Sequence, residues 1–499
     1  MHITLDFSSR IPLYVQIKNF LSEEILSGSL EANNRLPSTR RLAAELGVNR
    51  ITIANAYTEL ESEGLVYGRS GSGTYVSPGK KRLVDTDYSA ADYPLWQQRL
   101  ARESDTEAWW QSEAAASMES NPDVISFSSG MGAEELFPAD DYRKALQSVL
   151  QQDRGDALGY GELAGYYPLR ATISQILSEQ GITANPENIL ITSGSQQAMN
   201  LVSRLLLRPG DTILLEDPSY SSAIELFRSL DTNLVGVPVD ENGMQVEHVE
   251  ELLQKTHPAL IYTIPNFHNP TGACLSSARR RILVDLADRY NVPILEDEFV
   301  CDLRYEGNPR PALKALDSRG NIIYMSTFSK ILMPGLRIGY LVASGPVFEQ
   351  LLLSKRVNDL STSELIQRAL REYIAVGRYE THLNRARRLF RHRRDTMIAA
   401  MQRWLPEGTG WQEPQGGLFI WLRLPDGVTT SNLIPAALKE KVSFSPGNLF
   451  SVSEQFSSYI RLNFSCQPPE LIEEGIRRLG KAVKTSCKVS SNETNHETI

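Results

Sequence analysis

The sequence predicts a multi-domain chain, in which a small N-terminal α+β unit precedes a large α/β domain built on a mostly parallel sheet. With 499 residues the chain is too long for a single ordinary domain. Residues 10–77 show three helical patterns followed by a glycine-rich hairpin, whereas from Val124 onward short apolar runs alternate with amphipathic stretches. We therefore expect separate domains over residues 10–78 and 123–485.

Composition limits the classes of protein that fit this sequence. The N-terminus has no apolar stretch typical of a signal peptide, and no apolar run is long enough to span a bilayer. The four cysteines stand far apart without a CxxC pair, and the seven histidines show no metal-binding spacing. We expect a cytoplasmic chain that uses no metal and has no membrane partner.

The distribution of charge differs between the two ends of the chain. The formal net charge of −9 argues against non-specific nucleic-acid binding by the whole molecule. Residues 1–82, however, hold 10 Lys and Arg against 8 Asp and Glu, a net of +2, which leaves −11 for the remainder. A mildly basic head on an acidic body is the pattern expected of a local DNA-contact surface.

The head is predicted to contain three helices and a two-stranded wing. The residues that start and stop the helices are Pro12 and Gly28, then Ser38 and Gly47, then Asn49 and Gly64. Two short strands, at residues 65–69 and 74–77, flank a Ser-Gly-Ser-Gly turn. The second and third helices, joined by a short turn that contains glycine, form a helix-turn-helix.

Helical spacing turns the apolar residues of the third helix inward and leaves polar side chains exposed near its N-terminus. Such side chains read base edges in the major groove, and a helix N-terminus favours phosphate. The candidate DNA contacts in and around the helices are Arg35, Ser38, Arg40, Arg41, Asn49, Arg50, Thr52 and Asn55. In the wing, Gly71 and Gly73 allow the backbone to approach the minor groove. The alternative is a small helical bundle with solvated polar residues.

The stretch LPSTRRLAAELGVNRITIANAYTELESEGLVYGRSGSGTYV resembles the winged helix-turn-helix of GntR-type regulators. The likeness covers nearly the whole head and includes the wing glycines. It implies that residues 10–78 bind double-stranded DNA.

Three further segments have patterns of their own. Residues 79–122 are polar with isolated aromatic residues, which indicates a linker. Residues 359–483 have a mixed pattern that indicates a smaller second lobe. Residues 486–499 are polar, and we expect a disordered tail.

In the large domain, polar side chains follow the ends of predicted strands. The strands are expected at residues 189–192, 212–216, 259–264, 292–296, 322–325 and 339–343. The candidate site residues, in chain order, are Tyr160, Ser195, Gln196, Tyr220, Asn269, Asp297, Thr327, Ser329, Lys330, Arg337 and Arg461. The carboxyl ends of strands in an open α/β sheet are where ligands bind.

This set has the chemistry that pyridoxal 5′-phosphate (PLP) needs from a protein. The Lys330 amine can form an imine with the aldehyde, and Asp297 can hold the pyridine nitrogen protonated. Asn269 offers a donor to the phenolic oxygen, and Tyr220 offers an aromatic face for stacking. Donors for the phosphate are Ser195, Gln196, Thr327, Ser329 and Arg337.

From about Val124 to Val483 the chain resembles a fold-type I aminotransferase. The resemblance implies that Lys330 forms the Schiff base with PLP, that Tyr160 reaches the phosphate from the neighbouring subunit, and that Arg461 receives an amino-acid carboxylate. One departure is Phe299, which stands where the family usually has a tyrosine that joins Asn269 at the phenolic oxygen. Without that donor the pKa of the imine rises, which argues against efficient transamination.

A GntR-like head followed by an aminotransferase-like body is the layout of the MocR subfamily of bacterial regulators. The resemblance implies a PLP-dependent transcription factor that senses PLP or an amino-compound effector. It also implies a head-to-tail homodimer that binds paired operator half-sites. Two alternatives stay open: a working aminotransferase with an appended DNA-binding head, and a DNA-binding dimer whose PLP site is dead.

Overall fold

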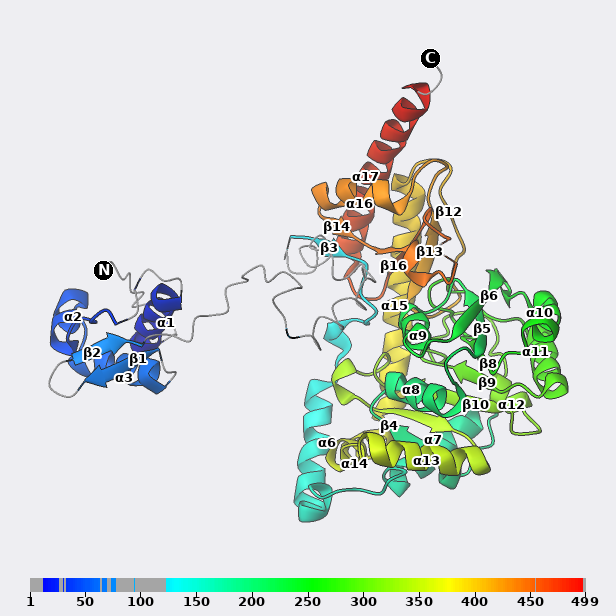
Figure 1. Cartoon of the computed structure of the whole chain (residues 1–499), viewed down its shortest axis with the longest axis horizontal. Coiled ribbons are helices and arrows are strands. Elements are labelled where there is room, and N and C mark those ends of the chain that lie inside the picture. The colour runs from blue at the N-terminus through cyan, green and yellow to red at the C-terminus, as the bar shows by residue number, and fades with distance from the viewer. Residues whose placement is uncertain are drawn as a thin grey trace. The chain divides into compact units, whose positions relative to one another are not determined.

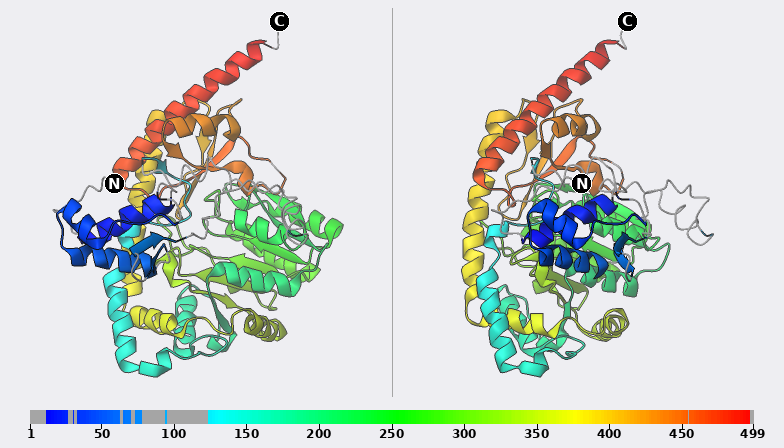
Figure 2. Two further views of the ribbon diagram at one scale, coloured as in Figure 1. Left: turned by 60° about the vertical axis from the view of Figure 1, so that its left-hand side comes forward. Right: turned by 90° about the vertical axis from the view of Figure 1, so that its left-hand side faces the viewer.

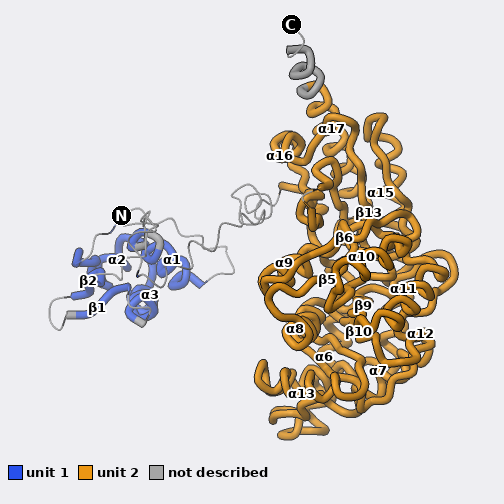
Figure 3. The backbone as a smooth tube through the Cα atoms, turned by 45° about the vertical axis from the view of Figure 1, so that its right-hand side comes forward, with its two compact units in different colours: residues 1–107 blue, residues 108–499 orange. Residues whose placement is uncertain are grey.

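The computed structural model of the chain describes residues 12–26, 30, 33–62, 65–69, 73–77, 94, 123–453 and 455–496. The chain divides into two compact units, residues 1–107 and residues 108–499 (Figure 3). The predicted linker over residues 79–122 lies, apart from Pro94, outside the described residues, as does Gly71 at the tip of the wing.

The N-terminal unit contains three helices and a two-stranded antiparallel wing (Figure 1), which confirms the predicted winged helix-turn-helix. The elements are α1 (Leu13–Leu26), α2 (Thr39–Leu46), α3 (Arg50–Ser62), β1 (Val66–Arg69) and β2 (Gly73–Val76). Their apolar residues form one core, in which Ile17, Leu21, Ile53, Ala56 and Leu60 are fully buried. This core fixes the face that α3 presents to solvent.

Local side chains set the helix boundaries as expected. Ser38 Oγ accepts a hydrogen bond from the Arg41 N–H at 3.3 Å, and Gly47 ends α2 in the left-handed region with φ 66°. Asn49 Oδ1 accepts from the Ile51 N–H at 3.0 Å at the start of α3. These bonds satisfy backbone donors that the first turn of a helix leaves without partners.

The larger unit is built on an eight-stranded sheet. Across the sheet the strands are β4 (Ile189–Thr192), β11 (Gly339–Val342), β10 (Ile322–Thr327), β9 (Ile294–Asp297), β8 (Leu260–Thr263), β5 (Thr212–Asp217), β6 (Asn233–Asp240) and β7 (Gly243–Met244). Neighbours from β10 to β6 run parallel, whereas β11 is antiparallel to both its neighbours and β7 to β6. The mostly parallel sheet is confirmed with every predicted strand present; β6 and β7 were not predicted.

Helices cover both faces of this sheet (Figures 1 and 2). They are α6 (Ala139–Gln152), α7 (Tyr167–Glu179), α8 (Ser195–Leu206), α9 (Ser221–Arg228), α10 (Val249–Thr256), α11 (Ser277–Tyr290), α12 (Leu313–Leu316), α13 (Pro346–Asn358) and α14 (Glu364–Ala375). In β9, Leu295 joins the core that contains residues of α8 and α9, whereas Ile294 joins the core with α10 and α11. Burial on both faces explains why these strands are continuous apolar runs.

Short 3₁₀ helices connect several of these elements. They are η3 (Glu134–Leu136), η4 (Arg154–Ala157), η5 (Pro186–Asn188), η6 (Val246–His248), η7 (Pro334–Leu336) and η8 (Gly447–Phe450). No helix among the residues that the structure describes is long and apolar enough to cross a membrane.

A smaller C-terminal lobe contains a four-stranded antiparallel sheet and three helices. The strands, in order, are β12 (Gly410–Trp411), β13 (Phe419–Arg423), β16 (Tyr459–Asn463) and β15 (Ser445–Pro446), and the helices are α15 (Arg378–Trp404), α16 (Thr430–Lys439) and α17 (Pro469–His496). β3 (Ile125–Ser126) pairs in parallel with β14 (Val442–Ser443), so the chain enters the large unit beside this lobe.

One expectation about the C-terminal part is wrong. α14 falls within the segment expected to form the second lobe, yet its Leu370 and Tyr373 pack with α6 and α7 in a core of the large domain. Residues 486–496 of the expected disordered tail continue α17. Ser486 is buried, and its hydroxyl donates to the Asn432 carbonyl at 3.3 Å, so this turn of α17 packs against α16.

Candidate functional site

The residues predicted to hold a phosphate meet at the start of α8. β4 ends at Thr192, and α8 begins at Ser195 after Gly194, whose φ is 94°. Arg337 lies beside this turn, and its Nη2 donates to the Ser193 carbonyl at 2.9 Å. A Cβ on Gly194 would come within 3.0 Å of the same nitrogen, so glycine is needed here. A helix N-terminus beside an arginine is a site for an anion.

Two further candidates lie at the end of β10: Thr327 is its last residue, and Ser329 follows it. Ser329 Oγ is buried and has no hydrogen-bond partner within the described residues, so it is free to donate to a ligand. Thr327 Oγ1 donates instead to the Ile338 carbonyl and accepts from the Ser329 N–H, both at 3.1 Å. Gln196 is exposed in the first turn of α8, where Ser195 is half-buried.

Asp297, at the end of β9, is a buried carboxylate with one oxygen unused. Its Oδ2 accepts a hydrogen bond from the Tyr262 hydroxyl at 2.9 Å, whereas Oδ1 is buried without a partner in the described part of the chain. Burial raises the pKa of Asp297 to about 7, and the Tyr262 bond opposes this rise. A buried acceptor that lacks a donor is costly, so this oxygen is suited to a ligand N–H.

Arg461, in β16, is a buried cation held from several sides. Its Nη1 donates to Asn269 Oδ1 at 3.0 Å, and its Nη2 donates to the Ser128 carbonyl at 2.7 Å. The guanidinium lies over the rings of Phe419 and Phe450, at 4.2 and 4.9 Å from their centroids. Burial lowers the pKa of Arg461 to about 10. Arg461 thus occupies the acceptor of the Asn269 amide, and Nδ2 is the donor of that amide.

Lys330 lies close to these groups. Burial lowers the pKa of Lys330, and the positive charges of Arg461 and Arg337 lower it further. A lower pKa leaves more of the amine neutral and therefore nucleophilic. Gly130 faces this amine: a Cβ at that position would lie 3.6 Å from Lys330 Nζ.

Tyr220 and Tyr160 occupy different environments. Tyr220 is half-buried at the start of α9. Burial raises the pKa of Tyr220, and the charges of Asp297 and Arg461 act on it in opposite directions. Tyr160 is 89% exposed in the loop before α7. The fold of one chain therefore gathers the predicted set except for Tyr160.

Two further aromatic residues, Phe299 and Tyr262, lie in the part of the chain that forms this site. Phe299 is buried, and its ring stacks on that of Phe419 with centroids 6.5 Å apart. Sequence analysis missed Tyr262, which lies inside β8 and has the pattern of a core residue. Only the pairing of β8 with β9, which sets Tyr262 opposite Leu295, brings its hydroxyl to Asp297.

The candidate DNA contacts lie mostly on the surface of the N-terminal unit. Those that are exposed are Arg35, Ser38, Arg40, Arg41, Asn49, Arg50 and Asn55, and Thr52 is half-buried. Arg41 pairs with Glu45 at 2.8 Å, and Arg35 lies under the wing, 3.0 Å from where a Cβ of Gly73 would stand. Sequence analysis missed Ile51, an apolar side chain 66% exposed in the first turn of α3.

Comparison with known proteins identifies both parts of the chain. Residues 13–76 match the family of bacterial regulatory proteins, gntR family, and residues 122–479 match aminotransferase class I and II. The probable rhizopine catabolism regulatory protein MocR of Rhizobium meliloti is 30% identical, over 96% of this chain and 95% of its own length. The chain belongs to the MocR subfamily of GntR-type regulators.

Enzymes also resemble this MocR-type chain. Aromatic-amino-acid aminotransferase 1 of Thermococcus litoralis is 36% identical over 73% of the chain and 89% of its own length. The crystal structure of LysN, the α-aminoadipate aminotransferase of Thermus thermophilus, complexed with N-(5′-phosphopyridoxyl)-L-leucine, has 33% identity and a TM-score of 0.71. The match covers 76% of this chain and 96% of that one.

The MocR-type chain is thus a DNA-binding transcriptional regulator with an aminotransferase-like domain, and its cofactor is PLP. The side chains present fit this cofactor. Asp297 Oδ1 lacks a donor, the turn before α8 with Arg337 suits a phosphate, and Lys330 supplies an amine of lowered pKa.

Proposed function

We propose that this MocR-type regulator senses PLP, or an amino compound that reacts with bound PLP, and that occupancy of the site changes its binding to DNA. The observation that carries the proposal is the buried carboxylate of Asp297, whose Oδ1 has no hydrogen-bond donor within the described residues. The same chain supplies an anion site at Arg337, the amine of Lys330 and a recognition helix. When bound, PLP supplies an aldehyde that combines with amines and a ring that withdraws electrons.

Individual roles follow from the atoms that are free. Lys330 Nζ binds the aldehyde carbon, Asp297 Oδ1 accepts from the pyridine nitrogen, and Asn269 Nδ2 donates to the phenolic oxygen. Tyr220 stacks on the ring. The phosphate is held by Ser195, Gln196, Ser329 and Arg337, with Thr327 orienting Ser329 through its bond to the Ser329 N–H.

Arg461 is assigned to the carboxylate of an amino-compound effector. Its Nη1 is bonded to Asn269 Oδ1, so a carboxylate that takes this nitrogen also frees Asn269. An effector with a carboxylate therefore changes the contact between Arg461 and Asn269, whereas an amine without one leaves this contact in place. This difference gives the site a means to distinguish effectors.

We further propose a head-to-tail homodimer in the cytoplasm, whose two heads bind paired operator half-sites. Tyr160 is 89% exposed and Leu158 is 68% exposed in the same loop, which suits a contact with a second copy of the chain. Through this contact Tyr160 reaches the phosphate of the other subunit.

On the DNA side, the exposed side chains around the start of α3 are assigned to base edges. Asn49, Arg50 and Asn55 offer polar groups, and Ile51 offers an apolar contact for a thymine methyl group. Ser38 has a structural role as well, because its hydroxyl caps α2.

The test is DNA footprinting on the upstream region of the protein's own gene, with and without PLP and candidate amino acids. We expect the protected region or its affinity to change with PLP, with an amino compound, or with both. An identical footprint under every condition contradicts the sensing proposal. A purified protein without absorbance from bound PLP, before and after PLP is added, would instead support a dead site.

A second candidate function is transamination, favoured by the lowered pKa of Lys330 and by Arg461 beside it. It predicts turnover: with an amino donor and a keto acid, the protein releases the new amino acid at an enzyme-like rate. Product measured by chromatography at less than one equivalent per chain after hours would exclude it.

A further inference from the structure

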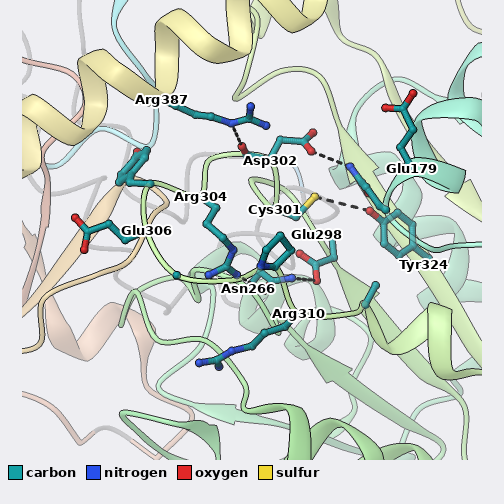
Figure 4. Close-up of a pocket in the computed structure, with 15 residues that line it drawn as sticks. Glu179, Asn266, Glu298, Cys301, Asp302, Arg304, Glu306, Arg310, Tyr324 and Arg387 are labelled. Atoms are coloured by element: carbon teal, nitrogen blue, oxygen red, sulfur yellow. Dashed lines mark hydrogen bonds between the residues drawn. The ribbon is translucent and has the colours of Figure 1, made fainter.

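A pocket of about 450 Å³ in the large unit is lined by none of the residues assigned to the cofactor (Figure 4). Its wall is formed by the segment that follows β9, by the end of α7 and by a side chain of α15. The volume falls within the range of sites for small molecules. The pocket is therefore a separate candidate for a ligand.

Three side chains in this pocket form a chain of hydrogen bonds that leaves two atoms unused. Asn266 Nδ2 donates to Glu298 Oε1 at 2.6 Å, and Asn266 Oδ1 accepts from Arg304 Nη2 at 3.3 Å (Figure 4). The same Oδ1 also accepts from the buried Arg280 Nη2 at 2.9 Å, so the amide joins Glu298 to two cations. Glu298 is 1% exposed. Glu298 Oε2 and Arg304 Nη1 are both buried without a partner in the described part of the chain. One is an acceptor and the other a donor.

Two other charged groups in the wall already have hydrogen-bond or ion-pair partners within the protein. Asp302 accepts hydrogen bonds from Gln180 at 2.8 Å and from Tyr379 at 3.0 Å. Glu306 pairs with Arg394 at 2.6 Å. The unmet hydrogen-bonding capacity is therefore concentrated on Glu298 and Arg304, which is expected of a site completed by a ligand.

The same two segments of chain serve this pocket and the cofactor site. Residues 266–269, after β8, carry Asn266 in the pocket and Asn269 beside Arg461. Glu298 directly follows Asp297, and β8 and β9 are neighbouring parallel strands. A ligand that orders Asn266 and Glu298 therefore acts on segments that also hold Asn269 and Asp297.

We propose that this pocket is a second small-molecule site, which binds a zwitterion that carries an ammonium group and a carboxylate, as an amino acid does. The ammonium group donates to Glu298 Oε2, and the carboxylate accepts from Arg304 Nη1. Cys301 and Tyr324, which also line the pocket, provide a less polar wall for the rest of the ligand. The proposal does not depend on how DNA binding is regulated.

The test uses the full-length, PLP-loaded protein and two zwitterions that cannot form an imine because their amines are tertiary. These probes are N,N-dimethylglycine and N,N-dimethyl-L-phenylalanine, and binding is measured by isothermal titration calorimetry. At least one probe is expected to bind saturably with one site per chain. Burial raises the pKa of Glu298 well above its usual range, so its carboxyl group must lose its proton to pair with the ammonium group. Glu298→Gln, which cannot ionise, and Arg304→Met, which removes the guanidinium, should each weaken this binding about tenfold or more.

The controls separate this pocket from its surroundings. Glu179→Gln removes an exposed carboxylate of the same wall, and Arg461→Lys alters the cofactor side; both should leave the affinity within about twofold. Each variant is first compared with the parent protein by circular dichroism, and two variants in different segments guard against a local folding defect. No saturable binding of either probe, unchanged binding in Glu298→Gln and Arg304→Met, or loss only in Arg461→Lys overturns the proposal. The last result would place the probe in the cofactor site, so it is distinct from a failure of PLP sensing.

Discussion

Replacing Asp297 with asparagine is expected to weaken PLP binding. The side chain is 3% exposed, and its Oδ1 has no partner among the described residues. A carboxylate at this position gives a protonated pyridine nitrogen a charge-assisted hydrogen bond worth about 1.5–3 kcal/mol, which an amide does not replace. The dissociation constant of PLP should therefore rise roughly 10- to 150-fold.

In the PLP-free protein the same substitution is expected to stabilise the fold, by an amount that depends on pH. Burial raises the pKa of Asp297 from 3.8 to about 7, against the Tyr262 hydrogen bond. Such a carboxyl contributes stability that is fully present below pH 3.8 and is lost as the pH rises through 7. Between about pH 5 and pH 8 this loss amounts to about 3 kcal/mol, or about 3–4 °C in melting temperature for a domain of this size. Asparagine does not titrate, so its advantage over aspartate grows over this range.

Two assays check both parts of this prediction. Absorbance titration measures the dissociation constant of PLP, and differential scanning calorimetry of the PLP-free protein at about pH 5 and pH 8 measures the melting temperatures. Asp285→Asn, at an exposed position of α11, is the matched control and should change neither. A PLP affinity within twofold of the parent protein would refute the role of Asp297. A variant that loses stability relative to the parent as the pH is raised over this interval would refute the account of its burial.

Four other substitutions test the remaining roles. Lys330→Ala should abolish the absorbance band of the imine with the protein, because no other amine is assigned to the aldehyde. Arg337→Gln should weaken PLP binding by about 1.5–3 kcal/mol, measured by equilibrium dialysis; an unchanged affinity would contradict the phosphate site. Asn55→Ala should weaken operator binding by about 1–3 kcal/mol in a gel-shift assay and leave PLP affinity unchanged. Phe299→Tyr should move the pH titration of bound PLP to lower pH, and an unmoved titration would show that this hydroxyl does not reach the phenolic oxygen.

The sequence predicts the parts of the fold that local patterns determine. β4 appears with the predicted bounds, and Ser38 and Gly47 delimit α2 as expected, because a cap or a buried apolar run is encoded within a few residues. Packing between distant segments is not encoded in this way. α14 joins the large domain because of what it packs against, and Ser486 of α17 is buried against α16; neither contact has a local signature.

The candidate site shows the same division. Lys330 and Asp297 lie in short motifs that resemble those of a known family, so the sequence alone indicates them. Tyr262 and the atoms left free in Glu298 and Arg304 depend on strand register and on the course of a loop. A residue that acts through a partner on another strand becomes visible only when the sheet is assembled.

The arrangement around the cofactor favours sensing because binding and turnover depend on different residues. In the proposed site Asp297, Arg337 and Lys330 contribute to the affinity for PLP: Asp297 Oδ1 lacks a donor within the described residues, Arg337 lies beside the turn before α8, and burial lowers the pKa of Lys330. The hydroxyl that Phe299 lacks would act mainly on the protonation of the imine, and therefore on rate. A regulator needs a ligand to bind one DNA-binding arrangement more tightly than another, whereas an enzyme needs extra contacts in the transition state. Phe299 removes a hydrogen-bond donor, whereas Asp297 and Lys330 are retained. This combination weakens transition-state stabilisation and leaves ligand binding in place.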